Sequence, residues 1–264
     1  MILKLLPPIT LAISMASAQG GTTIYAIDFD SVTTGSVNAS TLSAAGTGTT
    51  TAAWYLNPGR GAAYTIENDN SGNGDKALLA DDTNGGNANK QQFTGINFDN
   101  TFDLTSLDAS GSLNVSITTA TRRNGNNKNL QFQLANSTGS IGFLLAWSNN
   151  GTVAVNGTTF SPASAATNFE NVNPWNSTSD QVFDLNVSIA NDSSFTGNFG
   201  GVAFTGNLAN SVTDIDRIQL YSGGSAGGNK GAYLSNITVT AIPEPSSSAL
   251  LALTGLGFIH RRRR

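Results

Sequence analysis

The chain alternates between apolar and polar residues in many short segments, and this pattern predicts β-strands. Thr23–Asp30 (TIYAIDFD), Leu113–Thr119 (LNVSITT) and Val182–Ala190 (VFDLNVSIA) show the alternation most clearly. A period of two places successive side chains on opposite faces of an extended chain, so each segment is expected to bury one face. The other predicted strands are Ala53–Leu56, Tyr64–Asn68, Lys76–Ala80, Gln91–Phe98, Leu130–Leu134, Ile141–Trp147, Thr152–Val155, Ser194–Phe199, Val202–Phe204, Ile215–Tyr221 and Tyr233–Ala241.

Clusters of Gly, Asn, Asp and Ser separate the predicted strands, as at residues 68–74, 84–87, 124–127 and 222–225. These residues favour tight turns, because Gly and Asn tolerate a positive φ. No long run has the 3.6-residue period of a helix. The pattern therefore predicts an all-β, jelly-roll-like antiparallel β-sandwich of two sheets packed face to face. A β-helix is the main alternative, although no fixed repeat length is visible.

The first and last predicted strands carry a resemblance to known folds. The Ile-Asp-Phe-Asp sequence that ends at Asp30 and the Tyr-Leu-Ser-Asn-Ile-Thr-Val sequence that begins at Tyr233 resemble the terminal strands of concanavalin-like and carbohydrate-binding jelly rolls. In those folds the two terminal strands pair side by side, and the resemblance implies the same pairing here. No internal boundary is visible, so residues 19–241 are predicted to form a single β-sandwich domain.

The first 18 residues have the three-part pattern of a secretory signal peptide. A single cation precedes an apolar stretch over residues 5–15, and Ala16 and Ala18 then frame an A-x-A cleavage pattern before Gln19. A proline pair inside the apolar stretch argues against an ordinary N-terminal helix or strand, which is the alternative. Residues 1–18 are therefore predicted to direct export.

Residues 242–264 have a different three-part pattern. Pro243, Glu244 and Pro245 come first, an apolar run from Ala249 to Ile259 follows, and the chain ends on Arg261, Arg262, Arg263 and Arg264. Even when it is counted from residue 246, the run gives about 21 Å of helix against roughly 30 Å of hydrocarbon. It is expected to enter a membrane transiently as a short hydrophobic helix, with the arginines at the cytoplasmic face. The prolines keep the first part extended and accessible to a processing enzyme.

This order of a Pro-Glu-Pro motif, a short apolar run and an arginine cluster resembles a PEP-CTERM sorting signal. The resemblance implies recognition by an exosortase, a membrane-embedded cysteine transpeptidase that cuts near the Pro-Glu-Pro motif. It also implies a Gram-negative, exopolysaccharide-producing source and delivery to the cell envelope, the cell surface or the extracellular matrix. A generic short tail anchor is the alternative. The resemblance implies nothing about residues 19–241, because very different domains carry this tail.

Composition narrows the chemistry of the domain. The chain has no cysteine, and its only histidine, His260, lies in the C-terminal tail. A Ser-His-Asp triad, a thiol nucleophile and a His- or Cys-based zinc site are therefore excluded from the domain. Between residues 19 and 242, eight basic residues stand against sixteen acidic ones, a net charge of −8. This charge argues against nucleic acid as a partner and favours cations or neutral glycans.

One segment has the spacing of a calcium loop. Asp69, Ser71, Asn73 and Asp75 place oxygen atoms at alternating positions, as in the opening of a D-x-[DN]-x-[DN]-G loop. The twelfth position is Ala80 rather than the bidentate Glu, so an Asx-rich turn without metal is the alternative interpretation. A separate jelly-roll calcium site that uses Asp28 or Asp30 is a second candidate, with no partner ligand marked in the sequence.

Three aromatic residues are candidates for stacking on sugar rings: Trp175, in an Asn-Pro-Trp-Asn loop, and the adjacent pair Trp54 and Tyr55. Because neighbouring strand residues face opposite sides, one of the pair is expected to be exposed. Packing in the core is the alternative for each, since large aromatic side chains are mostly buried. Trp147 ends an apolar strand and is assigned to the core.

Paired carboxylates for glycoside hydrolysis are not marked. Glu67 and Glu170 are the only glutamates between residues 19 and 242, and no E-x-D-x-x-E cluster is present. Asp214 and Asp216 are interpreted as part of a solvated strand face. The expected function is that of an exported, non-catalytic surface or matrix protein, structural or adhesive in an exopolysaccharide matrix. A calcium-assisted carbohydrate-binding module and a polysaccharide-degrading enzyme are the alternatives.

Overall fold

A computed structural model describes residues 21–56, 63–68, 75–82, 91–122, 128–148, 153–160, 183–224 and 230–242. These residues belong to one compact unit, Gly21–Glu244. The predicted signal peptide and the predicted sorting tail beyond Ile242 lie outside the described residues. Within the ranges described, no helix is long and apolar enough to cross a membrane.

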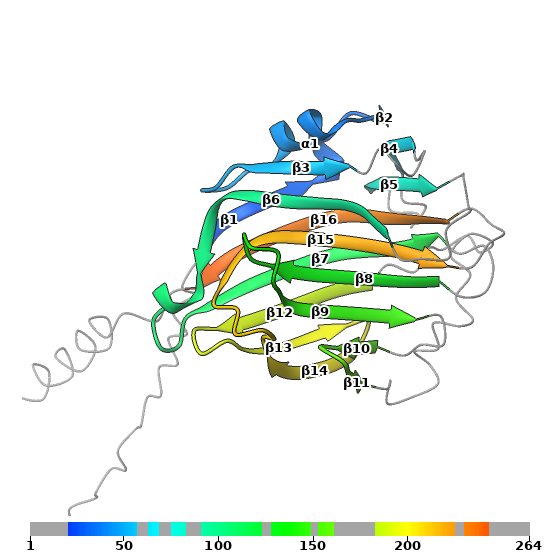
Figure 1. Cartoon of the computed structure of the whole chain (residues 1–264). Helices are drawn as coiled ribbons and strands as arrows, with labels where there is room; N and C mark the ends of the chain where they lie inside the picture. The colour runs from blue at the N-terminus through cyan, green and yellow to red at the C-terminus, as the bar shows by residue number, and fades with distance from the viewer. Residues whose placement is uncertain are drawn as a thin grey trace, which may run out of the picture. The chain divides into compact units, whose positions relative to one another are not determined.

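In the described ranges, sixteen strands form two antiparallel sheets, and this confirms the predicted jelly-roll-like β-sandwich (Figure 1). Sheet A has nine strands in the order β14-β13-β12-β7-β16-β5-β4-β2, with β1 also paired to β16. Its strands are β1 (Thr22–Asp28), β2 (Gly35–Ser36), β4 (Ala63–Asn68), β5 (Lys76–Asp82), β7 (Ser112–Arg122), β12 (Phe183–Ala190), β13 (Ser194–Phe199), β14 (Val202–Asn207) and β16 (Lys230–Ile242). Two packed antiparallel sheets rule out the β-helix.

Sheet B has seven strands in the order β11-β10-β9-β8-β15-β6-β3 and lies in front of sheet A in Figure 1. Its strands are β3 (Ala52–Leu56), β6 (Gln91–Asp103), β8 (Lys128–Ala135), β9 (Ile141–Ser148), β10 (Val153–Val155), β11 (Thr158–Phe160) and β15 (Asp214–Gly224). Three short helical elements complete the described fold: η1 (Phe29–Ser31), α1 (Ala39–Ala45) and η3 (Leu104–Ser106).

Every segment predicted as a strand overlaps an observed strand, several of which are longer than predicted, and the elements that were missed are short. The sequence pattern did not predict α1, which has too few residues to show a period and begins at Asn38, whose side chain accepts a hydrogen bond from the Thr41 N–H. It also missed β2 and β11. The first strand ends at Asp28, two residues earlier than predicted, because the Asp28 side chain caps η1.

The two terminal strands pair side by side, as the resemblance to concanavalin-like jelly rolls implied. β1 runs antiparallel to β16 from Thr22 opposite Ala241 to Asp28 opposite Asn236. The same edge of β16 then continues with β5, from Leu78 opposite Leu234 to Asp82 opposite Lys230. Strands β1 and β5 therefore lie end to end along one edge of β16.

The core lies between the two sheets and contains two groups of aromatic rings. Phe143 of β9 contacts Phe132, Phe195 and Phe204, with ring centroids 5.9, 5.1 and 5.9 Å away. Toward the other side of the sandwich, the Trp54 ring lies edge-on to Phe29 at 5.9 Å. Because most of these rings come from facing sheets, they fix how the sheets pack.

Candidate functional site

The outer face of sheet A carries rows of small neutral polar residues across β7, β12, β13 and β16. The strand registers place Asn186 opposite both Ser116 and Asn198, and Ser116 opposite Thr238. The next row contains Thr196, Ser188, Asn114 and Thr240. These residues alternate with buried apolar ones such as Val115, Val187 and Val239. The period of two therefore supplies both the core and this polar face.

A groove of about 470 Å³ lies on this face, over β7, β12, β13 and β16. Eight of its lining residues are Asn, Ser or Thr: Asn114, Ser116, Asn186, Ser188, Thr196, Asn198, Thr238 and Thr240. None of the described residues that line it is charged or aromatic. The groove is therefore an array of neutral hydrogen-bond donors and acceptors on a rigid sheet.

Some groove side chains are fixed by neighbours, and others are available to a ligand. The Ser116 hydroxyl donates to Asn186 Oδ1 at 2.8 Å, and the Gly201 N–H donates to Asn198 Oδ1 at 3.0 Å. Within the described part of the chain, the hydroxyls of Ser188, Thr196, Thr238 and Thr240 have no hydrogen-bond partner. Free hydroxyls beside oriented amides suit a ligand rich in hydroxyl groups.

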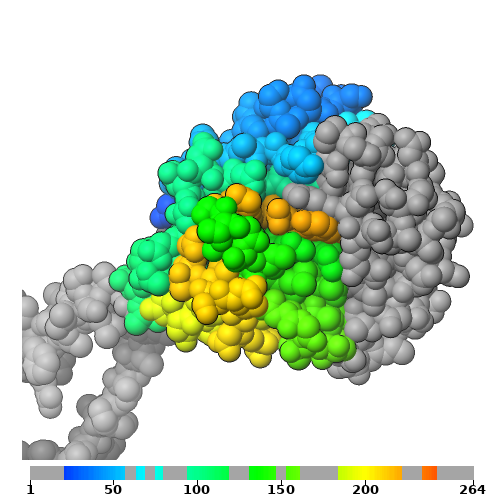
Figure 2. Space-filling view, in the orientation of Figure 1, coloured from blue at the N-terminus to red at the C-terminus, as the bar shows by residue number. Residues whose placement is uncertain are grey.

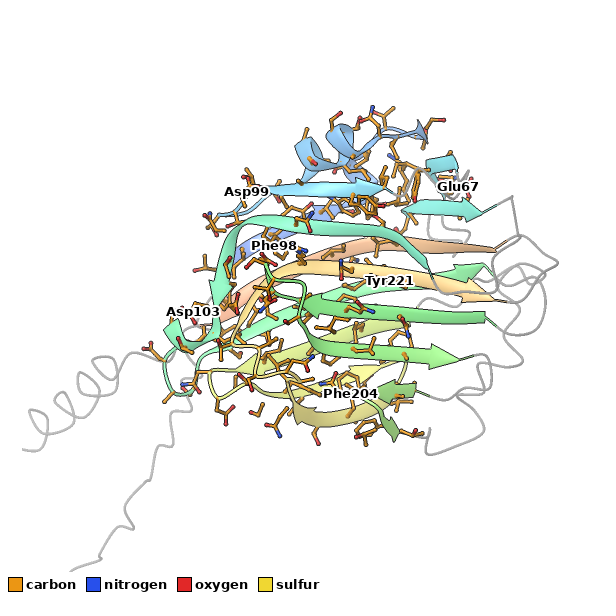
Figure 3. All side chains as sticks on the ribbon, viewed as in Figure 1. Glu67, Phe98, Asp99, Asp103, Phe204 and Tyr221 are labelled. Atoms are coloured by element: carbon orange, nitrogen blue, oxygen red, sulfur yellow. The ribbon has the colours of Figure 1, made fainter. Side chains whose placement is uncertain are left out.

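The outer face of sheet B is also polar but carries aromatic and longer side chains. Tyr55 of β3 is 41% exposed and, through Gly95, shares a row with Gln219. Burial raises the pKa of Tyr221, and the neighbouring Tyr55 raises it further. Figure 3 places Tyr221 along β15, and Figure 2 shows this face of the molecule. Gln133, opposite Gln219, is 6% exposed, and its Oε1 has no hydrogen-bond partner among the described residues.

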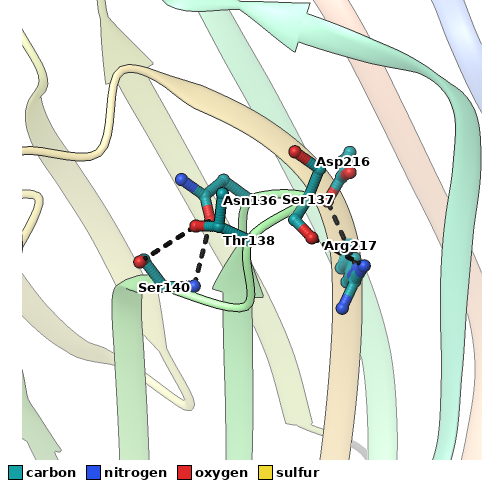
Figure 4. A network of polar contacts seen from close by, with 6 residues as sticks. All are labelled: Asn136, Ser137, Thr138, Ser140, Asp216 and Arg217. Atoms are coloured by element: carbon teal, nitrogen blue, oxygen red, sulfur yellow. Dashed lines mark hydrogen bonds and ion pairs between the residues drawn. The ribbon is translucent and has the colours of Figure 1, made fainter.

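Asp216 differs from the solvated carboxylate that the sequence indicated. It is 8% exposed, and burial raises its pKa, while Arg217 lowers it and Asp214 raises it. Arg217 Nε lies 3.5 Å from Asp216 Oδ1, and Arg217 Nη2 donates to the Ser137 carbonyl at 2.9 Å (Figure 4). The solvated-face interpretation is wrong for Asp216, because Ile215 and Ile218 are both buried and the alternation is interrupted between them.

Of the adjacent aromatic candidates, Trp54 is buried and Tyr55 is exposed, as the alternation of side chains along a strand requires. Trp54 is 5% exposed, and its indole N–H donates to the Tyr25 hydroxyl at 2.7 Å, so its ring belongs to the core. Burial raises the pKa of Tyr25 to about 12, which the hydrogen bond from Trp54 partly opposes. Tyr55 points outward and remains the described aromatic candidate for a ligand. Trp175 lies outside the described residues.

Most of the predicted calcium loop cannot be placed. Asp69, Ser71 and Asn73 lie outside the described residues, and Asp75 is exposed immediately before β5. The part of the chain that is described contains no group of three acidic, His or Cys residues able to hold a metal ion. Calcium binding by this loop stays a prediction.

Asp28 and Asp30, either of which was the second calcium candidate, lie beside Lys76. Asp28 Oδ1 accepts from the Asp30 N–H at 3.0 Å, and Asp30 Oδ1 accepts from the Lys76 N–H at 2.6 Å. The Lys76 ammonium donates to the carbonyls of Asp30 and Val32 at 2.8 and 3.0 Å. It therefore joins the end of β1 to the start of β5, where both strands meet along the edge of β16.

Replacing Lys76 with methionine is expected to lower the free energy of unfolding by about 1–2 kcal/mol, because two carbonyls lose their charged donor. Urea unfolding measures the loss. The acceptors are neutral carbonyls at short range, so the loss should persist in 1 M NaCl. A loss that disappears in high salt would mean that Lys76 acts through long-range charge instead.

Sequence reasoning missed the groove on sheet A. The signal was present in LNVSITT, VFDLNVSIA and NITVT, where the outward positions are almost all Asn, Ser or Thr. Alternation alone identified these positions as polar. Only the pairing of β7 with β12 and β16 brings the three segments together.

Comparison with known proteins gives no family for the chain. No family model matches it, and no curated protein matches it significantly. Among solved structures, it is similar to a sialidase (12% identity, 73% of this chain, 17% of that chain, TM-score 0.45). It is similar to the alginate lyase AlgAT5 from polysaccharide lyase family 7 (13% identity, 67% of this chain, 82% of that chain, TM-score 0.44). It is also similar to the botulinum neurotoxin serotype G binding domain (8% identity, 89% of this chain, 51% of that chain, TM-score 0.47). The chain thus spans less than a fifth of the sialidase's length, and similarities at this level say nothing about the chemistry of either face.

Proposed function

We propose that this protein is an exported, non-catalytic surface or matrix protein that binds a neutral polysaccharide in the groove on the outer face of sheet A. The observation that carries the proposal is the groove itself, with eight neutral Asn, Ser and Thr side chains from four neighbouring strands. Sugar hydroxyls both donate and accept hydrogen bonds, which matches side chains that do the same.

The absence of charge in the groove defines the class of glycan. No Lys or Arg is among the described residues that line it, so a polyuronate would bring its carboxylates to a surface on which these residues offer no cation. Asp184 lies in the adjoining row, where it accepts from the Thr118 hydroxyl at 2.8 Å, and it would repel an anionic chain. A neutral polymer meets neither penalty. None of the described groove residues is aromatic, so the affinity for a single sugar unit is expected to be low. A polysaccharide that contacts the groove with several units is expected to bind more tightly.

The test is affinity electrophoresis of the folded protein in gels that contain a soluble neutral polysaccharide, with a panel of glucans, mannans and galactans beside alginate. The double substitution Thr196→Ala and Thr238→Ala removes two free hydroxyls. At about 0.5–1.5 kcal/mol for each hydrogen bond, it is expected to weaken the neutral glycan's retention roughly tenfold.

The matched control is Thr159→Ala with Thr213→Ala, which alters two exposed threonines outside the groove and should leave retention unchanged. Tyr55→Ala tests the face of sheet B separately. The groove proposal fails if no neutral glycan retards the protein, or if Tyr55→Ala abolishes retention and the groove variant does not. Release of oligosaccharides during the same incubations would contradict the non-catalytic part.

Export and sorting belong to the same proposal and rest on the two terminal sequence patterns. The signal peptide is proposed to be removed before Gln19, and an exosortase is proposed to process the tail near Pro243-Glu244-Pro245. Intact mass of the protein recovered from its native cells should lack both segments. A mass that matches all 264 residues would contradict the proposed localisation at the envelope, surface or matrix.

A further inference from the structure

A cavity of about 250 Å³, open to solvent at one end, lies between the two sheets. Its walls come from β1, β7 and β16 of sheet A and from β6, β8 and β15 of sheet B. Ten of its fifteen lining residues are apolar, among them Leu113, Leu134, Ile218 and Val239. The other five are four threonines and Asn100, so the part of the lining that the structure describes carries no charge. The cavity is distinct from the polar groove, which lies on the outer face of sheet A.

The cavity lies where the pairing of β6 with β15 is interrupted for a few residues. Asn97 lies opposite Arg217 and Phe102 opposite Ile215, so the residues from Phe98 to Thr101 stand against the single residue Asp216. Phe98, Asn100, Thr101 and Phe102 line the cavity along this departure. Figure 3 shows where Phe98 and Asp99 lie on β6. Thr49 and Thr50 lie on the other side, held by N–H bonds to the carbonyls of Thr23 and Ile24 at 3.1 and 3.0 Å.

The chemistry of the walls selects an apolar occupant. Water needs two to four polar partners inside a protein, and the deeper wall supplies aliphatic side chains instead. Benzene occupies an engineered core cavity of about 150 Å³, so 250 Å³ takes about ten carbons by proportion. An alkyl chain bound against this wall would remove apolar surface from water and would therefore stabilise the folded protein.

We infer that this cavity binds the alkyl chain of an amphiphile, of about eight to ten carbons, with an uncharged head group at the threonine-rich mouth. Among the described lining residues, no cation is present at the mouth to hold a carboxylate or phosphate head. The Asp99 carboxylate, which accepts from the Thr51 hydroxyl beside the departure of β6, would repel an anionic head.

The test is calorimetric titration of the protein with hexyl, octyl and decyl glucoside below their micelle concentrations, with glucose and octanoate as comparisons. Affinity is expected to rise about fourfold for each added methylene up to about ten carbons, as burial of each methylene requires. Glucose should not bind detectably under these conditions, and octanoate should bind more weakly than octyl glucoside.

Ala241→Phe places a ring at the mouth and is expected to reduce octyl glucoside binding at least tenfold. Val239→Leu adds only one methylene and should weaken the binding of decyl glucoside more than that of hexyl glucoside. This variant still tests the inference if Ala241→Phe fails to fold. Ala53→Phe on the exposed outer face of sheet B is the control of equal size. The groove variant Thr196→Ala with Thr238→Ala should bind the alkyl chains normally, which separates this inference from the proposed polysaccharide site. Affinity independent of chain length, or unchanged in both cavity variants, would overturn the inference.

Discussion

Replacing Phe143 with alanine is expected to lower the free energy of unfolding by about 3–5 kcal/mol. The ring of Phe143 is fully buried, and it contacts one ring from its own sheet and two from sheet A. Its removal leaves a cavity where the two sheets meet, and rings held on separate backbones cannot close it. The loss is a large part of the roughly 5–15 kcal/mol that stabilises a typical domain.

Urea unfolding followed by tryptophan fluorescence and by circular dichroism measures this loss. Phe143→Leu keeps part of the volume and should lose clearly less than the alanine variant. Leu144→Ala is the neighbouring control, because Leu144 points away from the core and is partly exposed, and its expected loss is about 1 kcal/mol. Equal losses for Phe143→Ala and Leu144→Ala would contradict the assignment of Phe143 to the centre of the packing between the sheets.

Replacing Gly197 with alanine is expected to destabilise the fold by about 1–3 kcal/mol, although only one methyl group is added. Gly197 lies opposite Phe204, and Gly206 lies opposite Phe195, so each glycine of the β13–β14 pair faces a phenylalanine ring. A Cβ at Gly197 would come within 2.4 Å of the Phe204 ring and 2.6 Å of the Asn186 carbonyl oxygen. The ring can shift only by disturbing its contacts with Phe143 and Phe195.

A double-mutant cycle tests this mechanism. Phe204→Leu should recover part of the loss in the Gly197→Ala background, since the smaller side chain gives the methyl group room, although the contact with the Asn186 carbonyl remains. Thr205→Ala, on the outward side of β14, serves as the control and should change stability by less than about 0.5 kcal/mol. Strict additivity of the two core substitutions would show that the ring over Gly197 is not the cause.

The candidate site was only partly predictable, and particular residues show why. Trp54 and Tyr55 had to face opposite sides because both lie in one strand, and the core takes the larger apolar ring. Asp216 was misinterpreted, since it lies where the register of β15 against β6 shifts, and β6 is more than a hundred residues earlier in the chain. The Lys76 contact with Asp30 and Val32 had no local signal either, because it joins residues more than forty positions apart.

The amino-acid sequence by itself determined the strands, the two-sheet architecture and the neutral character of the outward positions on β7, β12, β13 and β16. These properties follow from local spacing, because alternate residues of any strand must share a face. Only the tertiary structure decided which strands are neighbours, and therefore that Ser116, Asn186 and Thr238 line one groove. It also decided that an apolar cavity opens where β6 leaves β15. Pairing between distant segments is selected by the packing of the whole core, so it leaves no signal within any one segment.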